Sequence, residues 1–360
     1  MATSKAKVKV KAAPRAASKA KAKAKKRKPV RRAARHGRHR ALVFLAVVAV
    51  LAAAVAALVL LNRQQAEIPL QASLALSAGT RGAALGALDS PRGLSVAPNG
   101  DVYVADLSNG RISVFGATGA FKQAFGHLGA EPGKGKPGEF NEPSSVAVGP
   151  DGTVYVADAW NGRIQKFDAK GKVLGEYGGA RYSFYSPRNV AVDRAGNLYV
   201  ADTGNSAVKV IDPSGKVIRT LGGRGSGGGK FNEVFGVAVN SRGEVFVADP
   251  GNKRIHKFSA NGDFVKDRKV PGWQTAAPFW PMLAVDGQDI VWAVDGGNHK
   301  LWAYDSDLKY RGTLGGAQGQ DLFSAPLGIG FAPDGSLWVS DVSANKLLKL
   351  NPPVIPAPTR

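Results

Sequence analysis

The chain has 360 residues, no cysteine, and 49 Lys and Arg against 27 Asp and Glu, which gives a formal net charge of +22. The absence of cysteine excludes a disulfide framework and thiol chemistry. Residues 1–40 hold 17 of the basic residues and no acidic one, so the rest of the chain carries only +5 (32 basic minus 27 acidic residues).

The first 40 residues form a basic arm that consists mainly of Ala, Lys and Arg. The arm contains nothing large to bury and is therefore expected to be disordered. Its alternating Lys-Ala run at residues 19–26 resembles the tails of linker-histone-like proteins. Such a composition suits nucleic acid or anionic lipid as a partner.

An apolar run of 21 residues follows at 41–61. A helix of about 20 apolar residues crosses a bilayer, so the run predicts an uncleaved membrane span. A cleaved signal peptide is the alternative, but the basic region is too long, the run exceeds the usual length of about 7–15 residues, and no small-x-small site follows. The charges before the span predict a cytoplasmic N-terminus and an extracytoplasmic remainder.

A five-residue sequence motif that ends in Asp recurs six times after the span, and Val-Tyr-Val-Ala-Asp is its clearest form. Successive copies are 44 to 52 residues apart, which is the length of four short strands with their turns. This period predicts an all-β fold, a six-bladed β-propeller over residues 70–350. The six copies end at Asp106, Asp158, Asp202, Asp249, Asp295 and Asp341.

The two ends of the repeat region predict how the ring closes. The sixth repeat is one strand short, because the proline-rich tail 351–360 follows its third strand. Residues 71–79 alternate loosely and precede the first repeat, so we expect them to supply the missing strand and remove an exposed edge. A linker of eight residues, 62–69, separates the span from the propeller.

The repeats resemble the NHL family, in which a Pro-x-Gly-Val-Ala-Val strand, a Val-Tyr-Val-Ala-Asp strand and an Asn-x-Arg-Ile strand follow in order. The first, second and fourth repeats match the third motif, whereas the other three depart from it. The resemblance covers about residues 85–350 and implies an NHL-type propeller. The Asn in the turn after most Asp residues also predicts a structural role for these carboxylates, which accept turn N–H groups and pair with Arg or Lys.

The entrance to the central channel bears on enzymatic activity. The residues expected to ring this mouth are Arg92, Ser144, Arg188, Phe235, Pro281 and Leu327. Calcium-dependent lactonase-type propellers, by contrast, place hard oxygen ligands there, and the amidating-lyase branch of NHL-like propellers uses histidines around zinc. The histidines after the arm fall in three different blades, at His127, His256 and His299. The sequence therefore predicts no catalytic residue, metal site or cofactor.

Two of the loops that enter blades, at residues 181–188 and 272–281, are rich in aromatic residues, whereas other entry loops have Gly-rich sequences. Blade-entry loops and the turns after second strands are expected to share one face, which we call the top face. We predict a ligand-binding surface there that comprises Arg92, Trp160, Tyr182, Tyr185, Arg188, Trp273 and Trp280. The alternative is that several of these rings fill gaps between blades. Three further aromatics on strands are expected in the core, at Trp292, Trp302 and Trp338.

These features predict a membrane-anchored, extracytoplasmic binding, scaffold or sensor propeller for a protein, peptide or glycan partner. Its layout resembles the tethered NHL sensor domains of bacterial receptor kinases, although the cytoplasmic arm has no room for a kinase. One alternative is a propeller lyase or hydrolase with an unrecognised metal site. Another is nucleic-acid binding through the basic arm.

Overall fold

The computed structural model describes residues 46–50, 67–129, 131–273, 280–316 and 322–356. The chain divides into two compact units, Met1–Arg63 and Gln64–Arg360. Residues 46–50 of the first unit are helical. Within the described residues, no helix has the length and apolar character needed to cross a membrane. The predicted arm and most of the predicted span lie outside the described residues.

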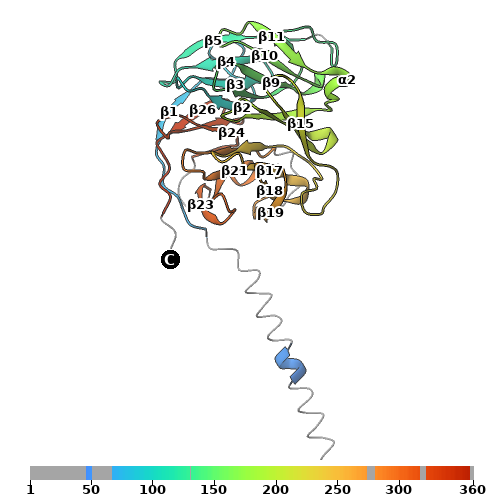
Figure 1. The fold of residues 1–360 in the computed structure, drawn as a ribbon. Coiled ribbons are helices and arrows are strands. Elements are labelled where there is room, and N and C mark those ends of the chain that lie inside the picture. Colours follow the sequence, from blue (N-terminus) through green and yellow to red (C-terminus); the bar gives the residue numbers. More distant parts are fainter. Residues whose placement is uncertain (1–45, 51–66, 130, 274–279, 317–321, 357–360) are drawn as a thin grey trace, which may run out of the picture. The chain divides into compact units, whose positions relative to one another are not determined.

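The second unit contains six four-stranded antiparallel sheets (Figure 1). Blades 1 to 3 comprise β2 (Pro91–Val96), β3 (Val102–Asp106), β4 (Arg111–Phe115) and β5 (Phe121–Phe125); β8 (Pro143–Val148), β9 (Val154–Asp158), β10 (Arg163–Phe167) and β11 (Val173–Tyr177); and β12 (Pro187–Val192), β13 (Leu198–Asp202), β14 (Ala207–Ile211) and β15 (Val217–Gly222). Blades 4 to 6 comprise β16 (Val237–Val239), β17 (Val245–Asp249), β18 (Arg254–Phe258) and β19 (Phe264–Lys269); β20 (Leu283–Val285), β21 (Val291–Asp295), β22 (Lys300–Tyr304) and β23 (Tyr310–Gly315); and β24 (Pro326–Phe331), β25 (Leu337–Asp341) and β26 (Lys346–Leu350) with β1 (Leu74–Ala78). The first strands of neighbouring blades contact one another around the whole circle. The predicted six-bladed propeller is confirmed.

The second strand of every blade is buried along its whole length. Neighbouring blades cover both faces of each sheet, so these strands bury side chains on both sides and read as nearly continuous apolar runs. The hydrophobic clusters accordingly join adjacent blades; one of them unites Ala105 of blade 1 with Val156 of blade 2. Trp292, Trp302 and Trp338 are buried, as predicted.

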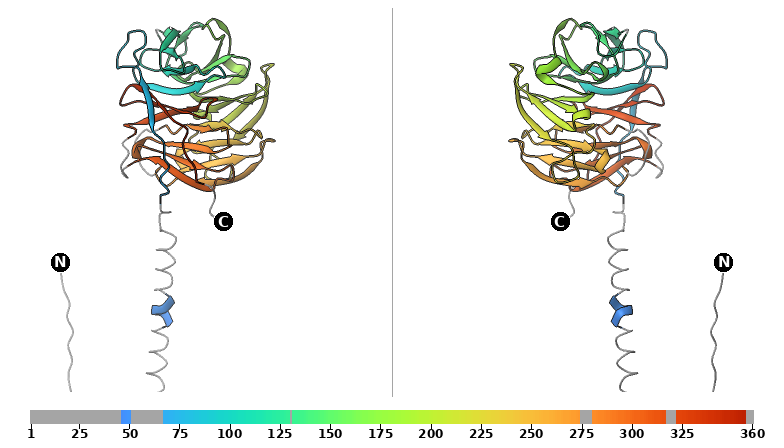
Figure 2. Two further views of the ribbon diagram at one scale, coloured as in Figure 1. Left: turned by 90° about the vertical axis from the view of Figure 1, so that its left-hand side faces the viewer. Right: turned by 90° about the vertical axis from the view of Figure 1, so that its right-hand side faces the viewer.

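The ring closes through the N-terminal strand. β1 pairs antiparallel with β26, with Leu74 opposite Leu350 and Ala78 opposite Leu347. Strand β1 therefore completes the sheet of β24 and β25, and Figures 1 and 2 show this blue strand beside the red strands of the last blade. The predicted closing strand at 71–79 is confirmed.

Residues 67–70, which we call the strap, bind blade 5 before the chain reaches the closing strand. Leu70 N donates to Thr313 O over 2.7 Å, and Thr313 N donates to Ile68 O over 2.8 Å. The Glu67 carboxylate pairs with Lys300 Nζ at 2.8 Å. Gly312 lies directly against the strap, because a Cβ there would sit 2.5 Å from Leu70 Cδ2. The strap therefore packs onto β23 of blade 5, whereas β1 belongs to blade 6.

Short elements decorate the loops between blades. β6 (His127–Leu128) and β7 (Glu139–Phe140) form a parallel ladder in the entry to blade 2. Helix α2 (Gly179–Tyr182) lies in the entry to blade 3. Single 3-10 turns follow four second strands: η1 (Ala159–Asn161), η2 (Thr203–Asn205), η3 (Pro250–Asn252) and η4 (Gly296–Asn298).

Candidate functional site at the channel mouth

The repeated Asp at the end of each second strand holds the loop that enters its own blade. In five blades, the carboxylate accepts the backbone N–H of a described residue 16 or 17 positions earlier. In blade 2, Asn141 N donates to Asp158 Oδ1 over 2.7 Å, and Asn161 Nδ2 donates to Asp158 Oδ2 over 2.9 Å. These bonds join the entry loops to the turns after the second strands, so both sets of loops share the top face.

The Arg five residues after the Asp clamps the same loop. In blade 2, Arg163 Nε donates to Asp158 Oδ2 over 2.8 Å. Its Nη2 donates to the carbonyls of Lys136 and Glu139 over 2.9 and 2.8 Å. Arg111 makes the equivalent contacts in blade 1. The repeated Asp and Arg therefore shape the top face from within, and they do not present a ring of ligands.

Five side chains from five blades meet over the end of the central channel. The Arg92 guanidinium carbon lies 3.9 Å from the centre of the Trp280 ring, and that of Arg188 lies 4.8 Å from it. Phe235 stacks on Trp280 with 5.9 Å between ring centres and 12° between planes. Arg188 Nη1 donates to Glu142 Oε1 over 2.6 Å. We call Arg92, Glu142, Arg188, Phe235 and Trp280 the mouth cluster.

Hydrogen bonding within the mouth cluster is incomplete. Arg92 Nε and Glu142 Oε2 are both buried and have no hydrogen-bond partner. Burial lowers the pKa of Arg92 to about 10, an effect that Glu142 opposes and Arg188 reinforces. Burial and the charge of Asp249 raise the pKa of Glu233, while Arg188 opposes that shift. The mouth cluster thus contains one buried donor and one buried acceptor without a partner, which is a cost to its stability.

The first strands line the channel that leads away from the mouth cluster. The channel has a volume of about 250 Å³. Its lining includes Leu94, Val146, Val190, Val237, Leu283 and Ile329. Neighbouring first strands approach closely, because a Cβ at Gly328 would lie 2.4 Å from Arg92 O. Most of the lining side chains are apolar and uncharged, and the charged groups of the mouth cluster belong to the residues at and before the starts of the first strands.

Two of the predicted surface aromatics are exposed on the top face. Trp160 in η1 is 57% exposed, and Tyr185 in the loop before β12 is 68% exposed. Their backbones are neighbours, because a Cβ at Gly162 would lie 3.1 Å from Phe184 O. Tyr185 also precedes Arg188 of the mouth cluster by three residues. Trp160 and Tyr185 are therefore exposed aromatic residues on adjacent top-face turns, and we call these two residues the aromatic rim.

Two other predicted surface residues are buried. Tyr182 is 6% exposed, and its hydroxyl donates to Gly215 O over 2.8 Å. Trp273 is 8% exposed, and its Nε1 donates to Val294 O over 2.9 Å. Each ring packs in a hydrophobic cluster with residues of two blades, so it fills a gap between blades and is not available to a partner at the surface. The prediction that all seven residues share one surface is therefore wrong for this pair.

Sequence reasoning missed the two carboxylates beside the mouth. Glu142 belongs to the mouth cluster, and Glu233 has a pKa that responds to Arg188. Both stand in the same text, Phe-Asn-Glu, immediately before the start of a blade. This shared position before a blade is the sequence signal that could have located both residues. The signal is hard to recognise because the entry loops differ in length from blade to blade.

The three histidines of the propeller lie apart. His127 is exposed, and His299 occupies a left-handed turn position with φ of 57°. His256 is fully buried beside Asp249. Among the described residues, no group of three or more His, Cys, Asp and Glu could hold a metal ion.

The repeats match a known family model, and one curated relative aligns with part of the chain. The NHL repeat model matches residues 88–115, 140–167, 184–211 and 231–258, within blades 1 to 4. A probable peptidyl-alpha-hydroxyglycine alpha-amidating lyase, pgal-1, from Caenorhabditis elegans is 35% identical over 96 residues. That alignment covers 25% of this chain and 26% of the relative, so the chain spans about a quarter of the length of the curated relative it matches.

Solved structures share the architecture at low sequence identity. Virginiamycin B lyase from Staphylococcus aureus superposes with a TM-score of 0.54 at 15% identity, over 78% of this chain and 99% of that one. A gluconolactonase from Xanthomonas campestris gives a TM-score of 0.56 at 16% identity, over 81% and 99%. At such identities the likeness concerns the fold alone. The chain therefore contains NHL repeats, which the family model matches in four of the blades, and it folds as a six-bladed β-propeller.

Proposed function

We propose that this NHL propeller is a non-enzymatic binding module whose top face captures a protein, peptide or glycan partner. The exposed rings of the aromatic rim, Trp160 and Tyr185, carry the proposal. Exposed Trp and Tyr rings bury a large area at low entropic cost, and they are enriched at the centres of binding surfaces. The partly exposed side chains of Arg188 and Glu142 add polar groups at the mouth.

The mouth cluster does not suit a divalent cation. Calcium and magnesium require several oxygen ligands, whereas Arg188 already occupies one oxygen of Glu142. The positive charges of Arg92 and Arg188 would oppose a second cation at this position. The residues present therefore favour capture of a polar group over metal-assisted hydrolysis.

A propeller lyase or hydrolase is the second candidate. It is supported by the 35% identity to a probable amidating lyase over 96 residues and by the shifted pKa values of Arg92 and Glu233. Perturbed ionisable groups gather at catalytic sites, although structural ion pairs also produce them. A metal that co-purifies with the propeller, or turnover that is lost in an Arg92→Gln variant, would favour this candidate.

The proposed setting is the outer face of a membrane. Residues 41–61 would anchor the chain, and residues 1–40 would remain in the cytoplasm, where nucleic acid or anionic lipid suits their charge. Protease added to intact cells or spheroplasts is therefore expected to digest or release the propeller and to spare the arm. Immunoblots against each part measure the result, with permeabilised cells as the control. Protection of the propeller in intact cells would contradict this topology.

The rim is tested by binding of the full-length protein to arrays of peptides and oligosaccharides. Trp160→Ala and Tyr185→Ala are each expected to weaken capture by more than about 2 kcal/mol, which corresponds to roughly 30-fold. Leu174→Ala is the matched control, because Leu174 is also exposed (54%) but lies on β11, the outer strand of blade 2. Equal capture by both rim variants and the wild type, or no binding to either array, would contradict the proposed function.

A further inference from the structure

Five blades carry a hydrogen-bonding side chain seven residues after the repeated Asp. Each of these side chains contacts the Asp carboxylate: Ser113, Gln165, Lys209, His256 and Trp302. Blade 6 places Leu348 at the equivalent position. We call this position, seven residues after the repeated Asp, the slot. It therefore accepts chemically different donors. His is the one among them that ordinarily changes charge between about pH 5 and 8.

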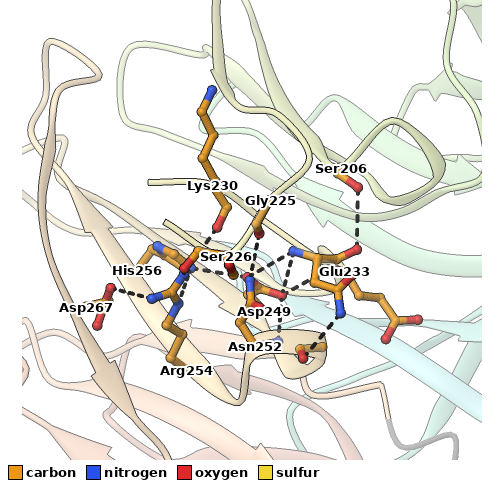
Figure 3. Close-up of polar contacts among 12 residues, drawn as sticks. Ser206, Gly225, Ser226, Lys230, Glu233, Asp249, Asn252, Arg254, His256 and Asp267 are labelled. Carbon is orange, nitrogen blue, oxygen red and sulfur yellow. Dashed lines mark hydrogen bonds and ion pairs between the residues drawn. The ribbon is translucent and has the colours of Figure 1, made fainter. Parts of the chain in front are cut away.

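Blade 4 differs from blades 1 and 2 in how its Arg is held (Figure 3). In blades 1 and 2, the Arg Nε donates directly to the Asp carboxylate, over 2.9 and 2.8 Å. In blade 4, Arg254 Nε lies 3.1 Å from His256 Nε2, and the same ring nitrogen lies 3.2 Å from Asp249 Oδ2. One nitrogen thus faces both a donor and an acceptor.

The surroundings of the His256 ring provide little compensation. The ring is fully buried and packs against Phe231 and Phe264, with centre distances of 4.9 and 6.0 Å. Its Nδ1 is buried without a hydrogen-bond partner. The charged groups on the elements around the ring are Asp249 on β17, Arg254 and Lys257 on β18, Lys266, Asp267, Arg268 and Lys269 on β19, and Arg224, Lys230 and Glu233 in the entry loop. Asp249 and Arg254 contact Nε2 directly, and Asp267 lies opposite His256 in the ladder and pairs with Arg254 Nη1 over 2.9 Å.

The protonation state of Nε2 determines whether this nitrogen hydrogen-bonds to Arg254 or to Asp249. When Nε2 carries no proton, it accepts the Arg254 Nε–H, and the proton on Nδ1 has no partner. When both nitrogens are protonated, Nε2–H donates to Asp249 and the positive ring repels Arg254. The guanidinium of Arg254 also donates to Ser226 O and Gly227 O over 2.7 and 2.8 Å. Displacing Arg254 therefore loosens its hold on the Gly-rich entry loop, residues 222–230.

We propose that His256 is a proton-binding site that releases the entry loop 222–230 from Arg254 at mildly acidic pH. The effect also reaches the mouth, because Glu233 N donates to the same Asp249 carboxylate over 3.0 Å, and Glu233 interacts electrostatically with Arg188. This second step, a pH-dependent change in partner capture, rests on the proposed function. The proton site itself does not.

Hydrogen exchange of the full-length protein between pH 5 and 8, corrected for intrinsic rates, tests the proton site. The amides of Gly225 and Phe231 report on the blade 4 loop, because each bonds within it. Their protection is expected to fall by up to about tenfold for each pH unit below neutrality if one proton drives the release. Gly82 and Leu88 are the internal control, since they occupy the matching loop of blade 1, where Ser113 fills the slot.

His256→Gln is the matched variant, because Gln165 fills the same slot in blade 2 and leaves Arg163 bound to its Asp. It is expected to remove the pH response while keeping the loop protected at pH 8. His256→Ser, which reproduces the slot of blade 1, serves if the Gln variant fails to fold. The proposal is overturned if the variant keeps the wild-type pH response, or if the blade 1 loop responds equally, or if the wild type shows no response. A responding loop with pH-independent capture on the arrays would retain the proton site and reject its link to the mouth.

Discussion

Deletion of residues 71–79 is expected to convert the folded propeller into a strongly destabilised, aggregating species. The deletion removes β1, so β26 becomes an exposed edge that carries Leu347, Leu348 and Leu350. Unpaired strand edges template association with other chains. The loss also reaches blade 1, because Ala78 packs in one cluster with Leu88. Size-exclusion chromatography and thermal unfolding of the deleted and intact chains measure both effects.

Leu74→Ser is the control for the deletion. Leu74 belongs to the same strand but is exposed, so the substitution is expected to change the free energy of unfolding by less than about 0.5 kcal/mol. If the deleted chain elutes at the same volume as the intact protein and unfolds at the same temperature, the ring must close by other contacts.

Asp158→Ala is expected to destabilise the propeller by about 3–5 kcal/mol, because it breaks a buried ion pair and leaves the buried Arg163 paired with the half-exposed Glu176. Arg163 Nε and Asn141 N would both lose an acceptor. Burial raises the pKa of Asp158 even though Asn141, Arg163 and Asn161 donate to its carboxylate. The ion pair therefore does not fully offset the cost of burying the charge, and its main role is to fix the entry loop. Urea unfolding measures the change.

Asp151→Ala is the matched control for this substitution. Asp151 also accepts a backbone N–H, from Thr153 over 3.0 Å, but it lies at an exposed turn. Its removal is expected to cost less than about 1 kcal/mol. Equal losses for the two variants would contradict a loop-holding role for the repeated Asp.

The blades were predictable because their sequence signals are local and repeated. The Asp spacing reports the length of four strands, and the apolar runs of the second strands follow from burial on both faces. The closing strand was predictable because the last repeat lacks a fourth strand of its own. Each of these inferences depends on residues close in sequence or on a regular period.

The mouth was only partly predictable, because it is assembled from loops of unequal length. Arg92 and Arg188 occupy a fixed position in their strands, and their place at the mouth followed from the repeat. Whether an aromatic residue points outward depends on how its loop folds: Tyr185 is exposed, whereas Tyr182, three residues earlier, is buried. Side-chain composition alone does not distinguish these two outcomes.

The strap at residues 67–70 determines where a pulling force on the N-terminal side of the propeller first acts. A force applied to the chain before residue 67 acts first on the hydrogen bonds that Ile68 and Leu70 form with Thr313 of β23. The ladder between β1 and β26 follows the strap in the chain, so it bears the force only after the hydrogen bonds of the strap to Thr313 have broken. The bonds of the strap to blade 5 therefore shield the β1–β26 seam of the ring from tension applied to the chain before residue 67.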